Sequence, residues 1–179
     1  MSNDIVSPGC LEFRNEVSRH YGWVLNEYGF VTVDERDSGG ERCLIVAESP
    51  DCRLRFMFDR GVVEVHVGRK EARPSWTDGR TGSVEWFAIT LVLSYLERRP
   101  KPTLKQLLEQ TRTARGLSAE ERMGQMAALL RQRAGDVFQL FREDAQGDRW
   151  REFVTYYTDT EDLARELQQK HGPVRSSSE

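Results

Sequence analysis

Residues 43–67 read CLIVAESPDCRLRFMFDRGVVEVHV, and this stretch decides the fold. It holds three apolar runs, separated by the turn signals Ser49-Pro50-Asp51 and Asp59-Arg60-Gly61. Within the second and third runs, apolar residues alternate with polar ones. A period of two is typical of half-buried strands, so we expect two consecutive antiparallel hairpins.

The register of both hairpins follows from keeping the apolar residues on one face. In the second hairpin this requires the pairs Phe58–Val63, Phe56–Val65 and Leu54–Val67. A slip of one residue would set Phe56 against Glu64, so it is disfavoured. With the first turn at Pro50 and Asp51, the first hairpin has the pairs Ala47–Leu54, Ile45–Phe56 and Cys43–Phe58, which places Cys43 in the core.

The opposite face of this sheet is mixed and carries Leu44, Val46, Glu48, Arg53, Arg55, Met57, Glu64 and His66. We expect it to be partly solvated. Arginine, glutamate and histidine together bind phosphate or move a proton. The same residue types also form ordinary cross-strand ion pairs, here Glu48 with Arg53, and this second interpretation is favoured.

Further elements flank the hairpins. Phe30 to Val33 alternates and adds a first strand, which gives a four-stranded antiparallel meander. An apolar stripe at helical spacing predicts a helix over 11–28 that stops at Gly29. Residues 84–98 are apolar nearly all round and predict a buried helix lying on the sheet.

The C-terminal part reads as helical. Capping-box patterns at Thr103 and Ser118, and possible caps at Asp148 and Thr160, predict helices over 104–115, 119–144, 149–157 and 161–171, with a kink at Gly135-Asp136. The predicted fold class is therefore α+β: an α+β domain over 1–98, a helical extension packed on it over 99–171, and a flexible tail over 172–179.

The connection over residues 69–83 is long for a compact domain, and such connections are often functional. It carries Arg69, Lys70, Arg73 and Arg80 against Glu71 and Asp78, a local surplus of two positive charges. It also carries Trp76, and tryptophan and arginine are enriched in binding hot spots. Two interpretations stay open: Trp76 contacts a partner, or it folds back as a lid on the core.

Composition excludes several classes. The chain has 179 residues and a formal net charge of −3, which argues against general nucleic-acid binding. Neither a membrane-spanning apolar run nor a secretory signal is visible. Three cysteines cannot all pair and form no CxxC, so we expect free thiols and a cytoplasmic location, with Cys52 exposed after its turn.

Motifs for catalysis or cofactor binding are not found. The three histidines, His20, His66 and His171, form no HxxxH, HxH or Cys/His cluster, so we expect no metal site. Phosphate-binding glycine loops and the GxSxG elbow are not found either. We therefore expect no cofactor and no catalytic residue.

Parts of residues 28–96 resemble known bacterial proteins. The resemblance rests on Tyr28-Gly29-Phe30, Glu48-Ser49, Arg53 to Phe56, Asp59 to Val65, and Glu85-Trp86-Phe87. Together these segments are similar to small immunity-protein-type domains that accompany polymorphic toxins or lie in defence loci. The resemblance implies a non-enzymatic protein that binds one cognate toxin.

The leading hypothesis is a non-catalytic cytoplasmic protein that blocks a cognate protein partner. The candidate contacts are Trp76, Arg73, Arg80, Arg69, Arg53, Arg55, Glu64 and His66. One alternative is a subunit of a bacterial defence or regulatory assembly that oligomerises through its C-terminal helices. A second alternative is an enzyme or nucleotide-sensing domain that uses the Arg53/Arg55/Glu64/His66 face.

Overall fold

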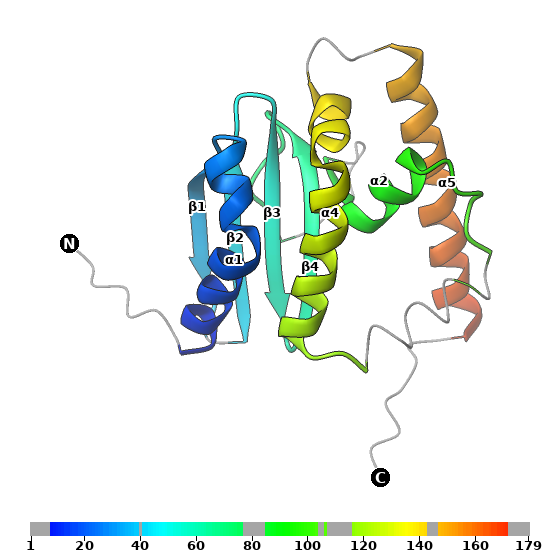
Figure 1. The fold of residues 1–179 in the computed structure, drawn as a ribbon. Helices are drawn as coiled ribbons and strands as arrows, with labels where there is room; N and C mark the ends of the chain where they lie inside the picture. Colours follow the sequence, from blue (N-terminus) through cyan, green and yellow to red (C-terminus); the bar gives the residue numbers. More distant parts are fainter. Residues whose placement is uncertain are drawn as a thin grey trace.

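The computed structural model of the chain describes residues 8–39, 41–76, 85–103, 106, 116–142 and 147–171 (Figure 1). Its elements are α1 (Pro8–Glu27), β1 (Val31–Asp37), β2 (Arg42–Glu48), β3 (Cys52–Asp59), β4 (Val62–Arg69), β5 (Trp86–Ala88), α2 (Ile89–Leu96), α4 (Ala119–Phe141) and α5 (Asp148–His171). The fold is α+β, as the sequence predicts: a helix, an antiparallel sheet and then further helices. The tail over 172–179, and all but Gln106 of the expected helix over 104–115, lie outside the described residues.

The sheet has the strand order β1-β2-β3-β4-β5, and each strand is antiparallel to its neighbour. Both central hairpins have the predicted register, with Phe56 opposite Ile45 on one side and Val65 on the other. The prediction is confirmed because a two-residue period leaves only this register with all the large apolar side chains on one face.

The fifth strand is a difference from the sequence prediction. Trp86–Ala88 extend the sheet by pairing with His66–Gly68, and helix α2 begins only at Ile89. This pairing depends on Gly68, because a Cβ atom there would lie 2.8 Å from the Glu85 carbonyl oxygen and 2.9 Å from the Trp86 ring. A glycine thus allows a close approach that no local apolar pattern predicts.

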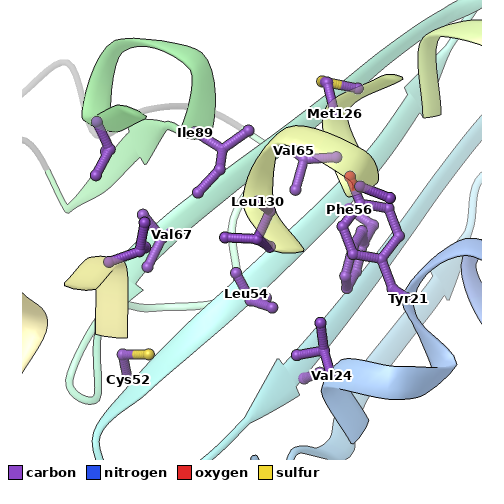
Figure 2. Packing of buried hydrophobic residues seen from close by; sticks show 14 of the residues in the cluster. Tyr21, Val24, Cys52, Leu54, Phe56, Val65, Val67, Ile89, Met126 and Leu130 are labelled. Carbon is purple, nitrogen blue, oxygen red and sulfur yellow. The ribbon is translucent and has the colours of Figure 1, made fainter. Parts of the chain in front are cut away.

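The hydrophobic core lies between one face of the sheet and the helices α1, α2 and α4 (Figure 1). Figure 2 shows Tyr21 of α1 and Leu130 of α4 facing side chains of β3 and β4. The Tyr21 ring meets Phe56 edge-on, with 4.8 Å between the ring centroids. The two helices cover the face that the alternation assigns to the core.

Helix α5 joins the same core through an aromatic cluster. Phe87 of β5 lies within 5.6 Å, centroid to centroid, of Phe141, Trp150, Phe153 and Tyr157. The prediction of two helices over 149–157 and 161–171 is wrong, because α5 runs through. The buried Thr160 hydroxyl donates to the Tyr156 carbonyl, so it does not cap a new helix.

Helix α4 begins as the sequence predicts, with a capping box in which Ser118 and Glu121 bond each other's backbone. The predicted kink at Gly135-Asp136 is misplaced, since the non-helical residue is Arg133, with φ −133° and ψ 16°. The Arg133 guanidinium reaches the Leu96 carbonyl at 3.4 Å and Asp136 at 2.7 Å.

The expectation of free thiols is wrong for two of the three cysteines. Cys10 at the start of α1 and Cys43 of β2 form a disulfide between helix and sheet. Cys52 is the free thiol of the described residues, and it is fully buried rather than exposed. The sequence could not show this pairing, because it depends on where α1 crosses the sheet.

None of the helices in the described part of the chain combines the length and apolar content that a membrane crossing needs.

Candidate functional site

The mixed face of the sheet is covered, contrary to the expected partial solvation. Leu44, Val46 and Met57 form a second apolar cluster with Ala72 and Trp86. The segment over 72–76 lies on this face and is held by its backbone carbonyls. These carbonyls accept bonds from Arg53, Arg55 and Trp86. The face is therefore largely an interior surface.

Arg55 shows this burial most clearly. Its side chain is fully buried, donates to the Ser75 carbonyl at 3.0 Å and lies 4.9 Å from the centroid of the Trp86 ring. His66, opposite Arg55 in the register, is also buried, and its Nε2 lies 3.9 Å from Glu64 Oε2. Neither buried side chain presents a surface to a partner in this conformation.

The cross-strand ion pairing favoured from the sequence is present at Glu48 and Arg53. The Arg53 Nε donates to Glu48 at 2.6 Å, and its Nη1 bonds the Ala72 carbonyl at 2.6 Å. Arg53 therefore clamps the covering segment to the sheet.

Trp76 packs against the second cluster and is half-buried, with the Arg42 guanidinium 4.8 Å from its ring centroid. These contacts favour the interpretation of Trp76 as a lid on the sheet. Arg73 is exposed, and its backbone N–H donates to Glu85. Arg80 lies outside the described residues, so the loop's role in partner binding stays a prediction.

Arg69, the last residue of β4, lies away from the covered face and lines a charged groove. The groove consists of two hollows of about 340 and 630 Å³ that share Asp51 and Arg142. Its lining residues come from the β2–β3 turn, the end of β4, the C-terminal half of α4 and Tyr28, which follows α1. Its lining consists of Pro50, Asp51, Arg69, Lys70, Glu71, Phe141 and Arg142 in one hollow, and Tyr28, Asp51, Gln139, Arg142, Phe138 and residues 131–136 in the other.

Positive charge exceeds negative charge in the groove. Five cationic side chains line it, against three carboxylates. The Arg142 Nε bonds Asp51 Oδ1 at 3.1 Å where the two hollows meet, and both side chains stay half-exposed. This surplus contrasts with the net charge of −3 of the whole chain.

Aromatic rings flank these arginines. The Arg131 guanidinium lies 5.3 Å from the Trp23 ring centroid, and that of Arg69 lies 5.9 Å from the Trp150 centroid. Stacking of this kind holds a guanidinium in place while it keeps N–H donors available for a carboxylate. Four of the five cations also have a carboxylate within 4.0 Å: Glu71 for Arg69, Glu27 for Arg131, Asp136 for Arg133 and Asp51 for Arg142.

Sequence reasoning missed most of this groove. It singled out Arg69, but not Arg131, Arg133 or Arg142, which lie in a segment interpreted only as a helix. The available signal was three arginines on one predicted helix, at positions 131, 133 and 142. What the sequence does not show is that the β2–β3 turn lies against it.

Cys52 does not supply a reactive group. Burial raises the pKa of its thiol to about 12, and Ser49 lies 3.8 Å from its sulfur. The thiol is therefore protonated at neutral pH and inaccessible.

No family model, curated protein or solved structure matches this chain.

Proposed function

We propose that this chain is a non-catalytic protein that binds an acidic segment of a partner protein in the charged groove. The observation that carries the proposal is the excess of cations over carboxylates along a groove flanked by aromatic rings. Arginine, tryptophan and tyrosine are the residue types most enriched in binding hot spots. A positive groove on a negatively charged chain also orients an acidic partner during approach.

The resemblance of residues 28–96 to immunity-type domains supports a more specific form of the proposal. In that form the partner is a cognate toxin, and binding blocks it sterically. The cytoplasmic location remains part of the hypothesis, and the Cys10–Cys43 disulfide weighs against it, since reducing compartments disfavour disulfides.

The two alternatives have weaker support. The nucleotide-sensing hypothesis needs an open Arg53/Arg55/Glu64/His66 face, whereas Arg55 and His66 are buried. The assembly hypothesis needs an apolar surface on the C-terminal helices, and among the large apolar side chains of α4 the exposed one is Leu129.

The test is affinity capture from lysate of the source organism with three baits, followed by mass spectrometry. The baits are the wild type, the double variant Arg131→Glu/Arg142→Glu, and Arg60→Glu as a matched control. Arg60 is an exposed arginine in the β3–β4 turn, at the opposite end of the sheet.

We expect wild type and control to enrich the same acidic protein and the double variant to lose it. Affinities of the purified pair should then fall as salt rises, because the contacts are charged. Equal enrichment by all three folded baits would contradict the proposal.

A further inference from the structure

A group of potential metal ligands lies away from the groove, where α1 meets the first turn of α4. Glu16 and His20 project from one face of α1, four residues apart, and Glu120 comes from α4. One ligand atom of each lies within 4.8 Å of the other two. We propose that these three side chains bind a divalent transition-metal ion of the zinc type.

The Glu16–His20 contact is an ion-pair distance that also suits two ligands of one metal ion. Glu16 Oε2 lies 3.2 Å from His20 Nε2. Both atoms are buried, and neither makes a hydrogen bond within the described residues. Two ligands of a tetrahedral ion at about 2.0 Å each lie about 3.3 Å apart, which matches this separation.

The packing around the His20 ring is also specific. Gly124 of α4 lies beneath it, and a Cβ atom at this position would be 3.2 Å from His20 Cε1. The missing Cβ atom at position 124 lets the His20 ring pack closely against α4. The His20 ring thus lies between α1 and α4, with its Nε2 3.2 Å from Glu16 Oε2.

The chemistry of the donors favours zinc or a similar ion. One imidazole nitrogen and two carboxylate oxygens suit Zn²⁺, Co²⁺ or Mn²⁺, with water completing the coordination. Glu120 is exposed and lies in the first turn of its helix, so it can move towards the ion. The bound ion would join α1 to α4.

Arg19 is the competing cation. Its Nη1 lies 3.2 Å from Glu16 and 2.9 Å from Glu120. The Arg19 side chain is mostly exposed, and surface ion pairs of this kind contribute little stability. An incoming divalent ion can therefore displace it, and removal of Arg19 should strengthen metal binding.

The test uses tag-free, oxidised protein titrated with Zn²⁺ alone by calorimetry, and with Co²⁺ by visible absorption. The variants are Glu16→Gln, His20→Gln and Arg19→Ala, with the exposed Glu41→Gln as control. We expect Glu16→Gln and His20→Gln each to weaken Zn²⁺ binding by about 100-fold or more, because losing a ligand exceeds the effect of losing an outer contact. Arg19→Ala should tighten it, and Glu41→Gln should leave it unchanged.

The alternative site is the Cys10/Asp37/Cys43 group, which also brings three ligand atoms together. Zinc binding that persists in Glu16→Gln and His20→Gln, or that is lost only in Cys10→Ser/Cys43→Ser, would overturn the proposal. The same holds if the wild type binds no zinc. Should His20→Gln fail to fold, Gly124→Ala displaces the ring instead and should also weaken binding.

Discussion

Arg55 is a buried cation at the centre of the covered sheet face. Its guanidinium is enclosed by the Ser75 carbonyl and the Trp86 ring, under a segment that Arg53 also clamps. A side chain of this kind acts as a structural tie, since it satisfies the backbone of an irregular segment that has no strand partner.

Arg55→Ala should destabilise the protein by about 2–4 kcal/mol, similar to a core truncation, because it leaves a cavity and an unsatisfied carbonyl. Phe56→Ala should cost about 3–5 kcal/mol. Urea denaturation of the two variants measures this, with the exposed Arg60→Ala as control. A cost for Arg55→Ala as small as that of the control would mean that the face is solvated after all.

Substitution of Gly68 and of Gly22 by alanine should change the stability of the protein in opposite directions. Gly68→Ala should cost about 1–3 kcal/mol, because its Cβ would overlap the Ala72 side chain and the backbone that leads into β5. Gly22 lies within α1, and a Cβ atom added there would meet no neighbouring atom within 4 Å, so Gly22→Ala should stabilise by about 1 kcal/mol. Thermal unfolding of both variants checks this, and a Gly68→Ala variant as stable as the wild type would contradict the packing described for β5.

Among the elements, the central hairpins were predictable in full because period, turn signals and register all agree. Strand β5 was not predictable, because its three residues pair with β4 only where Gly68 allows a close approach between segments distant in the sequence. The continuity of α5 was missed for a similar reason: Thr160 resembles a cap in sequence, but its hydroxyl bonds within the helix.

The disulfide joins α1 to β2, and it predicts the number of thiols that react with a thiol reagent. Without reductant, the native protein should show no reactive thiol, and the denatured protein should show one, from Cys52. Titration with a thiol reagent at neutral pH measures both. Two or three thiols in the denatured, unreduced protein would contradict the disulfide.

Cys52 also gives a pH dependence. Because the pKa of its thiol rises from 9.0 to about 12 on folding, the folded protein favours the protonated form. The stability contribution is complete below pH 9 and is lost as pH rises towards 12. Cys52→Ala should flatten the fall in unfolding free energy over this range, as measured by denaturation at several pH values; an unchanged slope would argue against the shift.

At the scale of the whole molecule, the groove exists only through tertiary structure. Asp51 in the β2–β3 turn and Arg142 at the end of α4 are 91 residues apart in the chain, and they meet beside the end of β4. The sequence predicted a basic, aromatic contact surface and placed it on the 69–83 loop. The start of that loop does line the groove, while Trp76 packs on the opposite face of the sheet.

The most direct test of the groove hypothesis is site-specific photo-crosslinking in the source cells. A photoreactive amino acid replaces Gln139, which lines the groove, or Arg60 at the far end of the sheet. We predict a discrete crosslinked product with an acidic protein from position 139 and none from position 60. A product from position 60 alone, or the same product from both, would contradict binding in the groove.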